Sequence, residues 1–148
     1  MPLLTLFIFG LLASLGALLA ELLVASFFID ANALNTPFVP THFSLLLFAL
    51  IEESLKIVFF LQASRRLITL PRPLTAGIVY GLGFASLEYF ALSLMHNLPA
   101  GPIYGILVVH LVTSILLVKL LPKYQGKKAL ISLLGLLTAL HFGYNILL

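Results

Sequence analysis

The chain has 148 residues, of which 61% are hydrophobic and only 9% are charged. Its eight basic and five acidic side chains cannot cover the surface of a water-soluble domain, since soluble chains are about a quarter charged. The mean hydropathy of +1.18 agrees, so lipid is the expected solvent for most of the surface. The chain contains no cysteine, which excludes disulfides, thiolate metal sites and cysteine nucleophiles.

The basic residues stand in short stretches beside apolar runs, which is the pattern that orients a membrane protein. The net charge of +3 therefore points to the lipid bilayer as a partner, and no nucleic acid is expected. No linker, low-complexity segment or internal repeat divides the sequence. Residues 1–148 are expected to form a single integral-membrane domain, and the oligomeric state is left open.

A hydrocarbon core about 30 Å thick requires roughly 20 helical residues, and five stretches of the sequence meet that length. The predicted fold is an all-α, polytopic bundle of transmembrane helices near residues 3–29, 41–63, 74–95, 102–121 and 128–148. The first stretch lacks a basic segment before its long apolar run. It is therefore predicted to be a retained span and not a cleaved signal peptide.

Seven of the eight basic residues lie in or beside the second and fourth connections: Arg65, Arg66, Arg72, Lys119, Lys123, Lys127 and Lys128. The positive-inside rule assigns these connections to the cytoplasm. This predicts a cytoplasmic N-terminus and an external C-terminus. The cytoplasmic (plasma) membrane of a prokaryote is the expected location.

Seven ionisable residues fall inside the predicted spans: Glu21, Glu52, Glu53, Lys56, Glu88, His110 and His141. Such residues are costly in lipid, so they are expected to face the interior of the bundle and to mark function. At a rise of ~1.5 Å per residue, those on the last four helices lie roughly 10–18 Å below the outer ends of their helices. Four helices of alternating direction thus bring them to one layer, which predicts a single site in the outer half of the bilayer.

Helical spacing indicates which way these side chains point. Gly77, Gly81 and Glu88 fall on one stripe, and the Gly-x-x-x-Gly pair lets another helix approach closely. Glu88 is therefore expected to face a neighbouring helix. Two further pairs share a face at i,i+4 spacing: His110 with Ser114, and His141 with Asn145.

Lys56 can pair with Glu52 at i,i+4 or with Glu53 at i,i+3, and the sequence leaves both pairings open. With neutral histidines the buried set carries four acids against one lysine, which low dielectric does not tolerate without bound protons or a cation. One solution is a general base or acid that works near neutral pH. The other is a divalent metal such as zinc, with these candidate ligands: Glu52, Glu88, His110 and His141.

Several intramembrane chemistries are excluded by the motifs. The sequence contains neither a His-Glu-x-x-His zinc motif nor a Gly-x-Ser-x-Gly elbow. Asp30 is the only aspartate and stands at the end of the first predicted span, so an aspartyl dyad inside the membrane is ruled out.

The remaining motifs occur one per predicted helix. Glu52-Glu53-Ser54-Leu55-Lys56 has the form Glu-Glu-x-x-Lys, and Phe84-Ala85-Ser86-Leu87-Glu88 has the form Phe-x-x-x-Glu. His110 follows, and then His141-Phe142-Gly143-Tyr144-Asn145, which has the form His-x-x-x-Asn. In this order they resemble the superfamily of glutamic-type intramembrane proteases that contains PrsW and the CPBP (CAAX protease, Abi) proteins. The first two motifs match the PrsW form and the last matches the CPBP form, within the motif-bearing helices 41–148.

The resemblance implies an intramembrane protease that hydrolyses peptide bonds of a membrane protein or peptide, with no cofactor expected. Its implied catalytic residues are Glu52, Glu53, Glu88, His110, His141 and Asn145, with Lys56 as a supporting charge partner. Glu52 would be the general base, whose charge state Glu53 and Lys56 set. Glu88 and His110 would orient water or protonate the leaving amine, and His141 and Asn145 would stabilise the oxyanion.

Two features depart from the family pattern: Ser114 stands where PrsW-type proteins carry an acid, and a single span precedes the motif helices. A metal-dependent version of the enzyme is one alternative. A second is a proton- or cation-coupled carrier, and a third is a non-catalytic scaffold like the scaffold subunit of gamma-secretase in the same superfamily. Glu21 is expected to act as an interhelical partner.

Overall fold

The computed structural model describes residues 2–28, 41–95, 100–124 and 126–147, which form helices and short connections without any strand. The long helices are α1 (Pro2–Phe28), α2 (His42–Arg66), α3 (Pro73–Met95), α4 (Ala100–Leu120) and α5 (Lys127–Leu147), and the short 3-10 helix η2 (Leu121–Lys123) follows α4. The predicted all-α bundle is confirmed, with each helix end within three residues of the expected position. Asp30, which was predicted to stand at the end of the first span, lies outside the described residues.

The ends of the helices follow from local sequence. α2 begins after Thr41, whose hydroxyl oxygen accepts a hydrogen bond from the Ser44 amide at 3.2 Å. It ends with Arg65 and Arg66, whose charges favour the negative end of the helix dipole and extend α2 beyond its apolar run. Gly126, with a φ of +97°, makes the left-handed turn that leads into α5.

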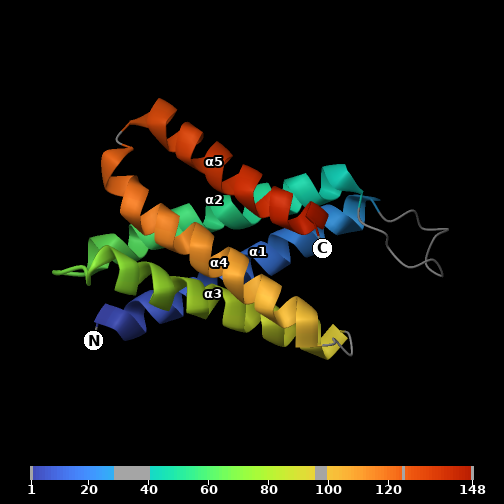
Figure 1. The fold of residues 1–148 in the computed structure, drawn as a ribbon, viewed down its shortest axis with the longest axis horizontal. Helices are drawn as coiled ribbons and strands as arrows, with labels where there is room; N and C mark the ends of the chain where they lie inside the picture. Colours follow the sequence, from blue (N-terminus) through green and yellow to red (C-terminus); the bar gives the residue numbers. More distant parts are fainter. Residues whose placement is uncertain (1, 29–40, 96–99, 125, 148) are drawn as a thin grey trace.

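The five long helices form a closed ring of contacts. α1 packs against α2 and α3, α4 packs against α3 and α5, and α5 packs against α2. In Figure 1, α3 and α4 run side by side, and α5 crosses α2 on the opposite edge of the bundle. Each helix therefore turns one face toward the others, and polar residues on these faces can meet across long stretches of sequence.

Two glycine-lined crossings fix α3 between its neighbours. A Cβ on Gly77 would lie 2.6 Å from the backbone of α4, and one on Gly81 would lie 2.8 Å from the carbonyl oxygen of His110. The close approach predicted for the Gly-x-x-x-Gly pair is thus confirmed, with α4 as the partner. A second crossing pairs Gly10 of α1 with Gly83 of α3, and a Cβ on either would overlap the backbone of the other helix.

Within the described residues, four helices are long and apolar enough to cross a membrane, over Pro2–Phe27, Pro73–Leu94, Tyr104–Lys123 and Lys127–Leu147. α2 has a similar length of 25 residues but carries Glu52, Glu53 and Lys56 in its middle, all of them buried. The outward-facing side chains are mainly leucine, isoleucine, valine and phenylalanine. The chain is therefore an integral membrane protein, whose apolar surface matches lipid.

The basic residues gather at one end of the bundle. The end of α2, the loop before α3 and the segment η2 meet there around a cavity of about 230 Å³, which Ser64, Pro73 and Leu121 help to line. Arg66 reaches α1 at the same end, where its guanidinium lies 5.4 Å from the centre of the Phe9 ring. The positive-inside rule uses these same basic residues to predict the orientation of the chain. The assignment of this end to the cytoplasm stays a prediction.

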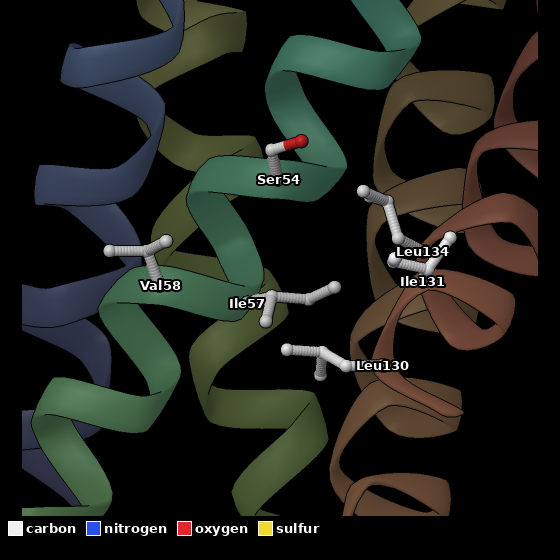
Figure 2. Close-up of a pocket in the computed structure, with 6 residues that line it drawn as sticks. All are labelled: Ser54, Ile57, Val58, Leu130, Ile131 and Leu134. Carbon is white, nitrogen blue, oxygen red and sulfur yellow. The ribbon is translucent and has the colours of Figure 1, made fainter. Parts of the chain in front are cut away.

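An apolar groove of about 180 Å³ separates α2 from α5 over part of their length (Figure 2). Its lining residues are Ser54, Ile57 and Val58 from α2 and Leu130, Ile131 and Leu134 from α5. All but Ser54 are hydrocarbon, so the groove suits a lipid environment. Next to it, a polar contact between Glu53 and His141 joins the two helices.

Candidate functional site

An ion pair in the middle of α2 forms the centre of a buried polar cluster. Lys56 and Glu53 are completely buried, and Lys56 Nζ lies 2.6 Å from Glu53 Oε1. Of the two pairings that the sequence allows, the structure forms the i,i+3 pair with Glu53 and not the i,i+4 pair with Glu52. Lys56 Nζ also lies 2.8 Å from His110 Nδ1 and 3.0 Å from Thr113 Oγ1, which links α2 to α4.

Two histidines extend the cluster to α3 and α5. His110 is completely buried, and its Nε2 is hydrogen-bonded to Glu88 Oε2 of α3. His141 of α5 places its Nδ1 2.8 Å from Glu53 Oε1. The two imidazole rings meet edge to face, with their centroids 5.2 Å apart. Four helices thus contribute side chains to one connected network.

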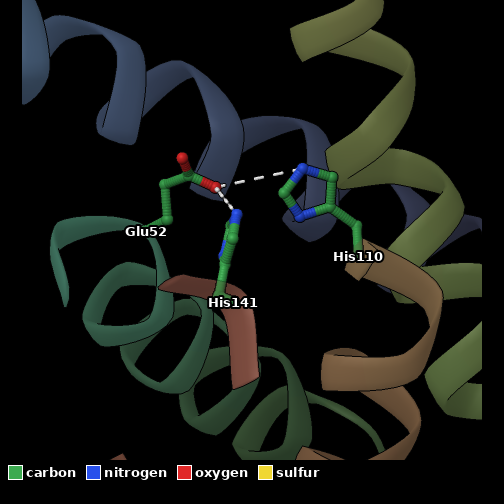
Figure 3. Close-up of side chains that lie close together, drawn as sticks. All are labelled: Glu52, His110 and His141. Atoms are coloured by element: carbon green, nitrogen blue, oxygen red, sulfur yellow. Dashed lines mark ion pairs between the residues drawn. The ribbon is translucent and has the colours of Figure 1, made fainter. Parts of the chain in front are cut away.

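Glu52 faces the same network but is not hydrogen-bonded to it. Figure 3 shows its carboxylate and the two imidazoles pointing toward one another from α2, α4 and α5. Glu52 Oε2 lies 3.7 Å from His141 Nε2 and 3.9 Å from His110 Nε2. Within the described residues this buried oxygen has no hydrogen-bond partner. These distances are too long for direct hydrogen bonds, but they suit groups bridged by a water molecule.

The predicted convergence of the polar layer is confirmed for Lys56 and for five of the six predicted catalytic residues. Hydrogen bonds and contacts shorter than 4.0 Å join Glu52, Glu53, Lys56, Glu88, His110 and His141. The sixth, Asn145, lies half-buried one helical turn beyond His141, and this network does not pass through it.

Glu21 brings α1 to the edge of the same cluster. Its carboxyl interacts electrostatically with Glu52 and with Glu88, and its Oε1 is buried without a hydrogen-bond partner in the described part of the chain. An interhelical position was expected for Glu21, and its neighbours are these two acids. All five long helices therefore supply an ionisable group to this region.

Thr113 was missed by the sequence analysis. It is completely buried, one turn beyond His110, and its Oγ1 lies 3.0 Å from Lys56 Nζ. The i,i+4 spacing had indicated Ser114 as the residue on the same face as His110. Ser114 is also buried, but its hydroxyl has no hydrogen-bond partner among the described residues and it lies beside Gly81. The signal for Thr113 was its i,i+3 spacing, which places it on the same face of α4.

Two aromatic residues of α3 support Lys56. The Phe84 ring lies 4.5 Å from Lys56 Nζ in a cation–π contact and 4.6 Å from the His110 ring, measured between ring centroids. This gives the phenylalanine of the Phe-x-x-x-Glu motif a physical role beside its glutamate. Tyr80 donates a hydrogen bond of 2.8 Å to the backbone carbonyl of Lys56.

The donor atoms for a metal are present in number and kind. One ligand atom each of Glu52, His110 and His141 lies within 4.8 Å of the other two. Three such ligands and a water are typical of catalytic zinc. Glu88, the fourth predicted ligand, is hydrogen-bonded instead to His110 Nε2, the nitrogen that faces Glu52. A metal at this place would have to compete with that hydrogen bond.

Comparisons of the chain with protein-family models, with curated proteins and with solved structures found no match. The resemblance to the PrsW and CPBP superfamily therefore rests on the four motifs, and membership stays a prediction.

Proposed function

We propose that this protein is an intramembrane endopeptidase of the glutamic type, in which Glu52 activates a water molecule. The observation that supports it most is Glu52, whose side chain is only 10% exposed and keeps one oxygen without a hydrogen-bond partner among the described residues, between two imidazoles. A buried polar atom without a partner is costly, so such an atom in a charged cluster suggests a binding position for water or substrate. Glu53 Oε2 is also buried without a hydrogen-bond partner among the described residues, so what distinguishes Glu52 Oε2 is its place between the Nε2 atoms of two imidazoles.

The reaction that fits this arrangement is hydrolysis of a peptide bond. Glu52 takes a proton from the water while the water oxygen forms a bond to the peptide carbonyl carbon. The C–N bond then breaks, and the leaving nitrogen receives the proton from Glu52. The products are a carboxylic acid and an amine, and Glu52 returns to its starting state. The Glu53–Lys56 ion pair neutralises the charge of Glu53 and so helps to set the charge state of the neighbouring Glu52.

The substrates in this proposal are membrane-embedded or membrane-adjacent peptides. The expected location is the cytoplasmic membrane of a prokaryote, with the site in the outer half of the bilayer. Asn145, one turn from His141, is then placed to contact a bound substrate, whose oxyanion its side-chain amide can stabilise.

A cleavage assay in lipid vesicles tests the proposal. Wild-type protein and the Glu52→Gln variant are incubated with transmembrane peptides, and the products are identified by mass spectrometry. Loss of a positioned general base is expected to slow cleavage by about 10²–10⁴-fold. The matched control is Ser14→Ala, which removes another buried side-chain oxygen that has no hydrogen-bond partner among the described residues and belongs to none of the proposed catalytic side chains. Cleavage that persists in Glu52→Gln would refute the role of Glu52.

A metal-dependent version is the second candidate, because the donor atoms of Glu52, His110 and His141 lie close together. In that version these three residues would hold a zinc ion, which would supply Lewis-acid chemistry. Chelation would then abolish cleavage, and metal analysis of the purified protein would find zinc. If the wild type cleaves no peptide, with or without added zinc, the scaffold and carrier hypotheses gain support.

A further inference from the structure

Lys56 has a hydrogen-bond acceptor for each of its donors. An ammonium group has three N–H donors and no lone pair. The three acceptors at Nζ are Glu53 Oε1 at 2.6 Å, His110 Nδ1 at 2.8 Å and Thr113 Oγ1 at 3.0 Å. Since Lys56 is completely buried, an N–H without an acceptor would be costly. Thr113 therefore completes the coordination of the charge.

The contact with Lys56 determines which nitrogen of His110 carries the hydrogen. Because the ammonium can only donate, His110 Nδ1 must accept. A neutral imidazole has one N–H, so the hydrogen lies on Nε2, which donates to the Glu88 carboxylate. His110 is thus in the Nε2–H tautomer.

His141 has the opposite arrangement. Its Nδ1 lies 2.8 Å from Glu53 Oε1, and a carboxylate can only accept. The hydrogen of His141 therefore lies on Nδ1, and the lone pair of Nε2 faces Glu52 Oε2 at 3.7 Å. A carboxylate and a lone pair at this separation leave room for a water that donates one hydrogen to each.

We propose that Thr113 is a positioning residue which, through Lys56, holds His110 in the Nε2–H tautomer while Glu53 holds His141 in the Nδ1–H tautomer. The N–H of His110 is then donated to Glu88, and the lone pair of His141 Nε2 faces Glu52. A zinc ion bound by both imidazoles needs two lone pairs there, so this pattern favours the water-activating chemistry over the metal version. The preference for water activation over zinc rests on the proposed function. The assignment of the two tautomers does not depend on it.

Nitrogen NMR of the full chain with labelled histidine, in lipid nanodiscs, reads the tautomers directly. The signals of His110 and His141 are assigned with His110→Gln and His141→Gln. In the wild type we expect a protonated Nε2 for His110 and a protonated Nδ1 for His141. In Thr113→Val the third acceptor of Lys56 is lost, and the single tautomer of His110 should give way to a mixture. Thr113→Ser, which keeps the hydroxyl, should restore the wild-type signals.

Ser114→Ala is the matched control, because it removes the neighbouring buried hydroxyl, which has no hydrogen-bond partner among the described residues. It should leave both histidine signals unchanged. A wild type with the same tautomer at both histidines would overturn the proposal, as would unchanged His110 signals in Thr113→Val. If Thr113→Val does not fold, Thr113→Ala and Thr113→Ser replace it, and equal His110 signals in these two variants would overturn the proposal as well.

Cleavage is measured on the same variants as a separate readout. Thr113→Val is expected to lower kcat about tenfold with little change in KM, because a mixture of tautomers reduces the competent fraction without removing a substrate contact. Unchanged cleavage in Thr113→Val, beside loss in Glu52→Gln, would contradict the positioning role and leave the proposed function standing. If the wild type does not cleave, the proposed function fails, and the NMR signals alone decide whether Thr113 sets the tautomer.

Discussion

Glu52 and Glu53 are neighbours in α2 and have different surroundings, although each keeps one buried carboxyl oxygen without a hydrogen-bond partner among the described residues. Glu53 Oε1 lies within 2.8 Å of both Lys56 Nζ and His141 Nδ1, so its charge is matched from two helices. Glu52 Oε2 is buried at nearly the same depth and has no hydrogen-bond partner in the described part of the chain. One residue along a helix is a rotation of about 100°. That rotation separates a carboxylate that bonds to Lys56 and His141 from one whose Oε2 faces two imidazoles without a hydrogen bond.

The largest loss of stability is expected when the ion-pair partner of Glu53 is removed. Lys56→Met removes the positive charge and leaves Glu53 buried without its ion-pair partner, which should lower the free energy of unfolding by about 3–5 kcal/mol. The measurement is denaturant unfolding in detergent micelles. Lys128→Met, at an exposed lysine, is the control and should change little. If Lys56→Met lowered the free energy of unfolding only slightly, Glu53 would not be ionised in the folded protein.

Glu53→Gln should have the next largest effect. The neutral amide keeps the size of the side chain but weakens two charge-assisted hydrogen bonds, which should lower the free energy of unfolding by about 1.5–3 kcal/mol. The same unfolding experiment measures it. The comparison of the two glutamates would break down if Glu53→Gln were as stable as the wild type.

Glu52→Gln should leave stability nearly unchanged, within about 1 kcal/mol, because Glu52 Oε2 has no hydrogen-bond partner among the described residues, an amide can still hydrogen-bond to Glu21, and a buried charge is removed. Cleavage should nevertheless be lost, as proposed above. Stability and activity would thus respond in opposite ways at adjacent positions. A Glu52→Gln variant that unfolds as easily as Glu53→Gln would point to a structural role for both.

The smallest expected effect is that of added zinc on the thermal unfolding midpoint. If the two histidines have opposite tautomers, added zinc should not raise the thermal unfolding midpoint. A resident metal at 100 times its dissociation constant would stabilise the fold by about 2.7 kcal/mol, which a thermal scan detects easily. His141→Gln distinguishes a shift caused by this site from binding elsewhere, since it removes the free imidazole lone pair.

Much of the fold follows from the sequence because membrane helices are long, apolar and bounded by polar or proline-containing segments. α2 was predicted too short at its end because Ser64, Arg65 and Arg66 are polar yet still helical. The crossing of Gly10 with Gly83 could not be foreseen, since single glycines do not specify a partner helix. The Gly77–Gly81 stripe did indicate a close neighbour, and only its identity was open.

The candidate site was predicted from depth, which depends only on the number of residues from a helix end. Rotation about the helix axis is less well determined, because positions three and four residues apart share a face. For this reason the sequence did not decide between Glu52 and Glu53 as the partner of Lys56, and it selected Ser114 where Thr113 makes the contact. The hydrogen-bond pattern of the two histidines required coordinates.

The ion pair within α2 also bears on how the protein is made. His110 and His141 are synthesised long after α2, so only Glu53 and Lys56 can neutralise each other when α2 leaves the ribosome. α2 is also the helix that carries three charged residues, Glu52, Glu53 and Lys56, within its apolar stretch. Its entry into the bilayer should therefore depend on this local pair and on α1, against which it packs. Glycosylation-site mapping of nascent chains that end after α2 should show reduced insertion in Lys56→Met.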